Sequence, residues 1–268
     1  MTMEIVGNGF LARNLRPIAD RHPDTAVLAA GVSWASGTSD DDFARESALL
    51  GEVAERCRAT GRRLLFFSTA STGMYGEGAT GREDSPVTPC TPYGAHKFAL
   101  EQQLKASGAD YLILRLGHLV GPGQPPHQLM PSLLRQVLEG GVRVHRGATR
   151  DLIDVADVVT LIDRLLDRGV RGETVNVASG EAVPVDHIVD HLQERLGLQV
   201  RREYRDAGAH HVISTQKLRR LVPETAGLGF TPTYYRQVLD AFLDSAGVVR
   251  GAGGPAAGER AATVPTAL

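Results

Sequence analysis

The sequence predicts an α/β fold, in which a doubly wound parallel sheet carries helices on both faces and a small α+β lobe follows toward the C-terminus. Two patterns predict it. Short apolar runs alternate with longer segments whose apolar residues recur at helical spacing, and the first run ends in a glycine-rich turn that opens a helical segment. Strands that alternate with helices usually pair in parallel through right-handed crossovers, so we expect that hand here.

The apolar runs place the strands, and the helical spacing places the helices. Strands are expected at residues 3–6, 26–30, 64–67, 111–114 and 174–177, with shorter candidates at 142–144 and 200–204. Helices are expected at residues 10–22, 43–60, 93–106, 129–138, 155–166, 185–196, 214–221 and 234–245. Residues 248–268 are dominated by Gly, Ala, Pro and Thr without periodicity, which predicts a disordered tail.

The composition of the 268 residues excludes several classes of function. Lys and Arg number 29 and Asp and Glu number 31, a net charge of −2, so nothing favours binding to nucleic acid or to an anionic membrane. The two cysteines, Cys57 and Cys90, exclude a disulfide scaffold and a Cys-rich metal site, and no metal is expected. No apolar run approaches a membrane span and no signal peptide is recognised, so we expect a cytoplasmic protein.

The turn Gly7-Asn8-Gly9-Phe10-Leu11-Ala12 fits the pattern Gly-x-Gly-x-x-Gly/Ala. The first glycine permits a tight turn, the second lets the backbone approach a pyrophosphate, and the alanine keeps the helix close to the strand. Free N–H groups at the start of the helix favour a phosphate. The position after the first strand is that of a dinucleotide-binding turn, and the alternative is a plain strand-to-helix turn.

The segment 93–97 contains a second motif, Tyr-x-x-x-Lys, formed by Tyr93 and Lys97. Residues four apart share one face of a helix. A lysine ammonium beside a phenol stabilises the phenolate and lowers its pKa, which makes the tyrosine usable in proton transfer. Of the 29 Lys and Arg residues only Lys97, Lys105 and Lys217 are lysines, so the pairing favours function over an exposed surface pair.

With these two motifs in place, the sequence from residue 3 to about 247 resembles the extended short-chain dehydrogenases/reductases, the nucleotide-sugar epimerase/dehydratase family. The shared motifs, in the family's order, are the glycine turn, Leu-Leu-Phe-Phe-Ser-Thr (64–69) with Met-Tyr-Gly (74–76), Tyr-Gly-Ala-His-Lys (93–97), Leu-Arg-Leu-Gly-His-Leu-Val-Gly-Pro-Gly (114–123), Arg-Asp-Leu-Ile-Asp-Val (150–155) and Val-Asn-Val-Ala-Ser-Gly (175–180). The resemblance implies a Rossmann-like dinucleotide-binding domain at 1–125 and 151–178 and a substrate-binding lobe at 126–150 and 179–247.

The resemblance also implies residue roles. Tyr93 is the general acid, and Lys97 lowers its pKa and binds the nicotinamide ribose. A hydroxyl residue orients the reacting oxygen: Thr69 when counted forward from the strand, Ser71 when counted back from Tyr75, and both stay open. The residues expected to contact substrate are Thr69, Ser71, His118, Arg150 and Asn176. For Arg150 the alternative is a salt bridge to Asp151, Asp154 or Asp157.

The cofactor is NADP(H) or NAD(H). The residues expected to bind it are Gly7, Asn8, Gly9, Phe10, Leu11, Ala30, Gly31, Ser68, Tyr93, Lys97, Leu116 and His118. A strand–helix–strand unit of the family's adenosine side is missing between Leu15 and Val27. The adenosine is then held by few contacts, or by Arg13, Arg16 or the loop 33–42; the two arginines favour NADPH.

These residues favour a reductase over the other activities of the family. We expect an NAD(P)H-dependent ketoreductase that acts on a nucleotide-linked keto-deoxysugar, such as a 4-keto-6-deoxyhexose, in deoxysugar or antibiotic biosynthesis. The alternatives are a nucleotide-sugar epimerase with retained NAD, and a reductase of another small ketone such as a polyketide. Dehydratases of the family carry Asp-Glu after the active-site Thr, and neither Ala70-Ser71 nor Thr72-Gly73 matches. A homodimer stays open.

Overall fold

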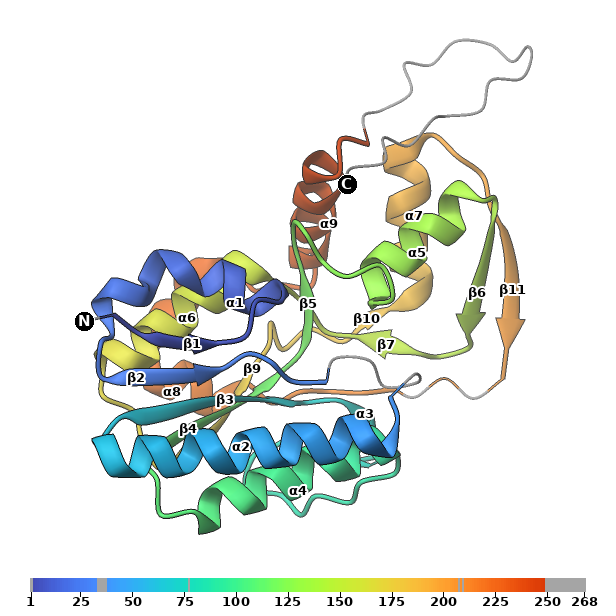
Figure 1. Cartoon of the computed structure of the whole chain (residues 1–268). Helices are drawn as coiled ribbons and strands as arrows, with labels where there is room; N and C mark the ends of the chain where they lie inside the picture. Colours follow the sequence, from blue (N-terminus) through green and yellow to red (C-terminus); the bar gives the residue numbers. More distant parts are fainter. Residues whose placement is uncertain (1, 33–37, 77, 207, 209, 249–268) are drawn as a thin grey trace.

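The computed structural model describes residues 2–32, 38–76, 78–206, 208 and 210–248, so the expected tail at 248–268 lies outside them except for its first residue. A five-stranded parallel sheet forms its centre, in the order β1-β2-β3-β4-β9 (Figure 1). The strands are β1 (Glu4–Val6), β2 (Thr25–Leu28), β3 (Arg63–Thr69), β4 (Tyr111–Leu116) and β9 (Glu173–Val177). The predicted α/β fold with a doubly wound parallel sheet is therefore confirmed.

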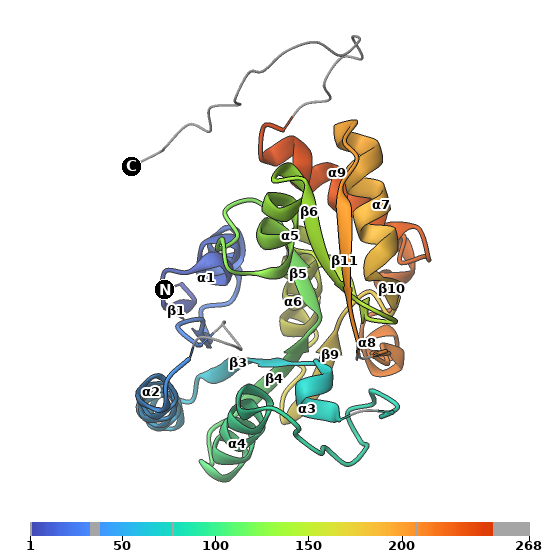
Figure 2. The same cartoon turned by 90° about the vertical axis from the view of Figure 1, so that its right-hand side faces the viewer.

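Helices cover both faces of this sheet. The first face carries α1 (Phe10–Leu15), the 3₁₀-helix η1 (Arg16–Arg21), α6 (Val155–Asp167) and α8 (Gln216–Leu221). The second face carries α2 (Asp40–Thr60) and α4 (Pro92–Ala106), which lie side by side in Figure 2. Alternate strand residues enter two separate apolar clusters, Leu65 on the first face and Leu64 on the second, as the period of a β-strand requires. No helix among the described residues is long and apolar enough to span a membrane.

A smaller group of elements lies beside the carboxyl ends of the strands (Figures 1 and 2). Its helices are α5 (Leu129–Leu138), α7 (Val185–Leu196) and α9 (Tyr234–Ser245), with η2 (Pro223–Leu228) beside α8. Its strands pair as β6 (Gly141–His145) with β11 (Arg201–Arg205), and β7 (Thr149–Arg150) with β10 (Val183–Pro184). The connecting pair is β5 (His118–Val120) with β8 (Leu152–Asp154), and α3 (Thr72–Tyr75) follows β3. One apolar cluster runs from the sheet into this group, so the division into two domains stays a prediction.

The first predicted helix is shorter than its apolar spacing indicates. The α-helix α1 ends at Leu15, and residues 16–21 continue as the 3₁₀-helix η1 with Pro17 at its start. Proline has no N–H to donate and its ring clashes with the preceding turn, so it ends the α-helix. Leu15 and Ile18 are nevertheless both buried, in the apolar cluster that also contains residues of α6, as the apolar spacing predicts.

The expectation of uniformly right-handed crossovers is wrong. The chain passes from β1 to β2 and from β2 to β3 in the same direction across the sheet. Yet α1 and η1 pack on one face, through Leu15 and Ile18, while α2 packs on the other, through Leu50 and Val53. Crossovers that step in one direction over opposite faces have opposite hands, so one of these two is left-handed, against the usual preference.

The shortened segment expected after α1 is visible in the sheet. Strand β1 pairs with β2 on one side, and no other described strand pairs with it. The strand order therefore runs in one direction from β1, without the reversal that creates the binding crevice of a complete dinucleotide fold. The sheet ends where the adenosine half of such a fold would continue.

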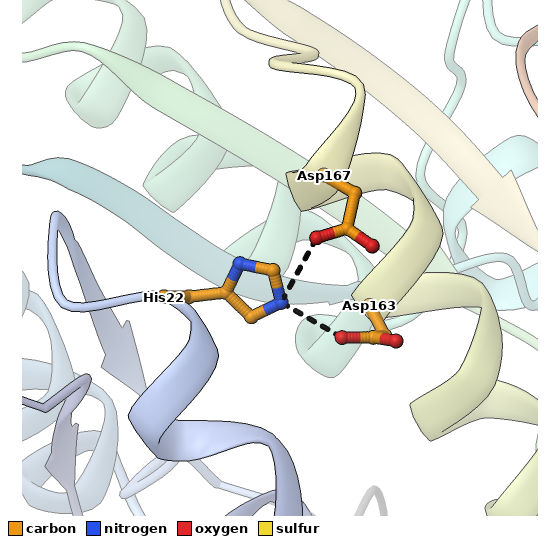
Figure 3. A group of neighbouring side chains, drawn as sticks. All are labelled: His22, Asp163 and Asp167. Carbon is orange, nitrogen blue, oxygen red and sulfur yellow. Dashed lines mark hydrogen bonds and ion pairs between the residues drawn. The ribbon is translucent and has the colours of Figure 1, made fainter.

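A buried ion-pair cluster fastens η1 to α6 at the end of the first crossover. His22 Nε2 lies 2.8 Å from Asp163 Oδ1 and 4.0 Å from Asp167 Oδ1 (Figure 3). Arg21 also pairs with both carboxylates. Because the Arg21 guanidinium bridges the two acids of α6, we interpret the group as a structural tie that holds the short crossover on α6.

Asp163→Asn tests this tie. Asp163 is buried and contacts both His22 and Arg21, so removing its charge leaves a buried network incomplete, and we expect the free energy of unfolding to fall by about 1–3 kcal/mol. Urea denaturation measures the change. The control is Asp167→Asn, because Asp167 is exposed and surface pairs contribute little. Equal losses in the two variants would contradict the assignment.

Candidate functional site

The helix α4 presents Tyr93 and Lys97 toward the carboxyl ends of the strands. Thr91 caps the helix by accepting a hydrogen bond from Gly94 N, and Pro92 occupies the first position, where its missing N–H costs nothing. Tyr93 is half-buried and Lys97 is 3% exposed. The ammonium lies 5.8 Å from the centroid of the tyrosine ring. The structure thus brings together the two residues that the motif predicts as partners.

A buried network fixes the rotation of α4 against the sheet. One turn beyond Lys97, Glu101 accepts two hydrogen bonds from Arg115 on β4, at 2.9 and 2.8 Å. Arg115 also donates to the Tyr75 hydroxyl at 2.9 Å, and that hydroxyl donates to Asn176 Oδ1 at 2.8 Å. The network joins α4, β4, α3 and β9.

Asn176 is completely buried within this network. Its amide nitrogen donates to Gly81 O and Ser214 O, and its oxygen accepts from Tyr75. Every polar atom of this side chain therefore has an internal partner. The observed contacts tie β9 to two loops, and the substrate contact expected for Asn176 stays a prediction.

The hydroxyl residues after β3 lie against the start of α4. A Cβ on Gly94 would overlap the backbone of Gly73, so the absence of a side chain lets α3 pack directly beside Tyr93. Thr69 is buried and its hydroxyl accepts a hydrogen bond from Ser71 N at 3.2 Å. Ser71 is half-buried, and its hydroxyl makes no hydrogen bond within the described residues. The Thr69 hydroxyl therefore keeps its own O–H to donate, while the hydroxyl of the less buried Ser71 is free both to donate and to accept.

A carboxylate on α2 binds the lysine. Glu46 Oε1 accepts a hydrogen bond from Lys97 Nζ at 2.6 Å, and its Oε2 lies 2.9 Å from His96 Nε2. Burial alone raises the pKa of Glu46, but the bonds and charges of His96 and Lys97 outweigh burial and hold that pKa below its usual value. The sequence analysis missed Glu46, although it shares the apolar stripe of α2 with Leu50, and an acid on an apolar stripe signals a buried partner.

The charges around Tyr93 act in opposite directions on its phenol. Burial is the largest influence and raises the pKa of Tyr93 above its ordinary value. The Lys97 ammonium lowers that pKa, and the Glu46 carboxylate raises it. The net result is a phenol that holds its proton at neutral pH.

The glycine turn stands beside the end of β2 with its backbone exposed. Gly7 has φ +124°, and a Cβ there would lie 2.7 Å from the carbonyl carbon of Ala29. Gly9 is the N-cap residue of α1, and no side chain caps the first N–H groups of this helix. The turn therefore offers an uncovered backbone cradle that a dinucleotide fits, with exposed Ala30 and Gly31 next to it.

The remaining residues expected at the cofactor occupy the same end of the sheet. Phe10 is buried and Leu11 is half-buried at the start of α1. Ser68 and Leu116 are buried at the carboxyl ends of β3 and β4. Arg13 donates to Asn8 O and Gly123 O, both at 3.0 Å, so its guanidinium links the glycine turn to the loop after β5. Residues 33–37 of the loop 33–42 lie outside the described residues.

Arg150 lies on the lobe side of the strands. Arg150 is half-buried, donates to Thr149 O, and makes no ion pair with any described residue, so the alternative salt bridge is not observed. Its neighbour Asp151 instead accepts from Ser179 and Gly180, and burial raises the pKa of this acid to about 6.

His118 faces this unneutralised arginine. Its Nδ1 is buried and has no hydrogen-bond partner among the described residues. Burial, with the charges of Arg150 and His211, lowers the pKa of His118 to about 3, so the ring is neutral at physiological pH. His211 is buried, and its Nε2 binds Ala70 O beside the hydroxyl residues. A free cation and an unpaired ring nitrogen together suit an anionic, hydrogen-bonding ligand.

The chain is similar in sequence to known proteins. The chain is 31% identical over 193 residues to a dTDP-6-deoxy-L-talose 4-dehydrogenase (NAD(P)(+)) of Kitasatospora kifunensis, covering 65% of this chain and 59% of that protein. It is 27% identical over 191 residues to a GDP-6-deoxy-D-mannose reductase of Pseudomonas aeruginosa, covering 64% and 63%. The matches thus span less than two thirds of the length of either relative.

The fold is shared as well. A solved structure of RMD from Pseudomonas aeruginosa complexed with NADPH superposes with a TM-score of 0.74 at 21% identity, covering 91% of this chain and 96% of that one. Residues 12–178 match the family model described as the NAD dependent epimerase/dehydratase family. Since this match takes in more than half of the chain, the protein belongs to the NAD-dependent epimerase/dehydratase family.

Proposed function

We propose that the protein is an NAD(P)H-dependent ketoreductase that acts on a nucleotide-linked keto-deoxysugar, such as a 4-keto-6-deoxyhexose. The observation that carries the proposal is the Tyr93–Lys97 pair at the carboxyl ends of the strands, beside an open glycine turn. Reduction of a ketone needs a proton donor, and Tyr93 is a phenol that holds its proton at neutral pH.

The residues of the chain divide the work of the reaction between them. When bound, NAD(P)H supplies a hydride to the carbonyl carbon. Tyr93 donates its proton to the carbonyl oxygen, and Lys97 stabilises the phenolate that this leaves. Ser71 hydrogen-bonds the same oxygen and orients it. We favour Ser71 over Thr69 because Ser71 is half-buried with no hydrogen bond from its hydroxyl within the described residues, whereas Thr69 is buried and its hydroxyl already accepts from Ser71 N.

The basic side chains of the lobe face suit the nucleotide diphosphate of the substrate. Arg150 lacks an anionic partner within the described chain, and a diphosphate supplies one. His118 has an unpaired Nδ1 that can bind a sugar or phosphate oxygen. The two relatives named above act on dTDP- and GDP-linked deoxysugars, which supports this substrate class.

The remaining assignments belong to the same proposal. Arg13 is committed to backbone carbonyls, which leaves Arg16 on the exposed surface of η1 as the nearer candidate for a 2′-phosphate of NADPH. A cytoplasmic location, a place in deoxysugar or antibiotic biosynthesis and a homodimer are further expectations. The direct test of the proposed function is incubation with a panel of nucleotide-linked keto-sugars while NADPH and NADH oxidation is followed. Absence of oxidation with every ketone would contradict it.

Gly7→Ala tests the cofactor cradle. The added Cβ would overlap the backbone at Ala29, and an L-residue at φ +124° is strained, so we expect NADPH to bind about tenfold or more weakly. Quenching of protein fluorescence measures the affinity. Gly147→Ala is the matched control, because Gly147 also has positive φ but faces open space. Equal affinities in both variants would place the cofactor elsewhere.

Tyr93→Phe tests the proton donor. The substitution removes the hydroxyl and keeps the ring, so we expect kcat to fall by about 10²–10⁴-fold while NADPH affinity stays nearly unchanged. Steady-state kinetics and fluorescence titration give the two values. Unchanged turnover would remove Tyr93 from the mechanism.

Retention of cofactor separates the reductase from the alternative epimerase. A reductase exchanges its cofactor at every turnover, whereas an epimerase regenerates it and profits from holding it tightly. We expect protein purified without added cofactor to carry little NAD(H), as measured by absorbance after denaturation. A full complement of bound NAD would favour epimerisation.

A further inference from the structure

The Glu46 carboxylate joins three residues of the candidate site in one buried group. Its two oxygens bind consecutive side chains of α4, Lys97 at 2.6 Å and His96 at 2.9 Å. Glu46 and Lys97 are each 3% exposed. Such a pair is costly to desolvate, so its burial against the apolar cluster of α2 and β3 calls for a role beyond stability.

The surroundings leave the ammonium no other anionic partner among the described residues. Lys97 Nζ lies 3.4 Å from Phe67 O and 5.3 Å from the centroid of the Phe66 ring. A Cβ on Gly31 would overlap Glu46 Oε1 and lie 3.1 Å from Lys97 Nζ, so the backbone at the end of β2 closes directly over the pair. The lysine is held in place from α2, β2 and β3 at once.

The carboxylate is itself held. His96 binds its second oxygen, and the imidazole stacks on Phe43 with ring centroids 4.2 Å apart. Phe43 and Glu46 lie three residues apart on α2, so the helix supplies both the stacking surface and the acid.

We propose that Glu46 is a positioning residue of the reductase, which fixes the Lys97 ammonium beside Tyr93 and opposes its charge, and that His96 orients Glu46. The proposal rests on the proposed function. An isolated ammonium would favour the phenolate and hence proton abstraction. With the carboxylate beside it, the phenol stays protonated and ready to donate, which matches reduction of a ketone.

Titration of Tyr93 in the protein without added cofactor or substrate tests the proposal. Among the described residues, the titratable groups around the ammonium are Tyr93 and His96 on α4 and Glu46 on α2, and none comes from the ends of β2 and β3. Glu46→Gln keeps an oxygen that accepts from Lys97 but removes the negative charge. We expect the pKa of Tyr93 to fall by about one unit, measured by phenolate absorbance against the same variant carrying Tyr93→Phe.

Gln103→Ala is the matched control. Gln103 makes the other hydrogen bonds between α4 and α2, to Ser47, and touches neither Lys97 nor Tyr93. We expect the Tyr93 titration of this variant to match that of the wild type, whatever its thermal stability. A downward shift of similar size in Gln103→Ala would mean that looser helix packing, and not the Glu46 charge, moves the phenol.

Glu46→Ala adds a second measurement. Without its anchor the lysine side chain gains freedom, and we expect NADPH to bind about tenfold more weakly by fluorescence titration. The proposal is overturned if Glu46→Gln leaves the Tyr93 titration unchanged, or if a folded Glu46→Ala binds NADPH as the wild type does. If Glu46→Ala does not fold, the Glu46→Gln titration decides. None of these measurements uses a ketone, so they remain decisive even if no sugar in the panel is reduced.

Discussion

The buried ion pair between Glu101 and Arg115 is the interaction on which the geometry of the site depends. Glu101 is fully buried and Arg115 is 2% exposed, and two parallel hydrogen bonds lock their orientation. A buried pair adds little net stability, but it permits few arrangements of the elements that carry it. Tyr93, Lys97 and Glu101 follow one another on α4 at intervals of about one helical turn. The bonds from Glu101 to Arg115 of β4 therefore also direct Tyr93 and Lys97 toward the strand ends. Through Tyr75 and Asn176 the same constraint reaches α3 and β9.

The helices and strands can be predicted from the sequence because the pattern that indicates each of them is local. The apolar spacing of residues 129–138 and 185–196 depends on one helix each, and both helices appear with those bounds. The pairing of Tyr93 with Lys97 follows from helical spacing in the same way. The apolar stripe of α2 signals that Glu46 is buried, but its partner Lys97 lies 51 positions away, and only tertiary packing brings the two together. Thr69 and Ser71 are separated by a two-residue count that the sequence leaves open, and the structure adds that Thr69 is the more buried of the two and accepts from Ser71 N.

The short crossover after β1 explains where the fold departs from expectation. Helix α1 contacts α6, Leu15 of α1 and Ile18 of η1 lie in one apolar cluster, and Arg21 and His22 join the end of η1 to Asp163 and Asp167 of α6. The chain then enters β2 directly, so the crossover takes the hand opposite to that of its neighbour. The same shortening leaves β1 at the sheet edge, beside a glycine turn that is fully formed. The nicotinamide side of the fold and its adenosine side are therefore built to different extents.

The proposed reduction of a ketone by hydride transfer at the Tyr93 site is tested by following the hydride itself. The protein is incubated with NADPH deuterated at the transferable position of C4 and with a nucleotide-linked 4-keto-6-deoxyhexose, and the sugar product is examined by mass spectrometry. The expected product gains one deuterium at the new carbinol carbon, with one equivalent of NADP⁺ formed. A product without deuterium, or an epimerised sugar with no net oxidation of the cofactor, would contradict the assignment.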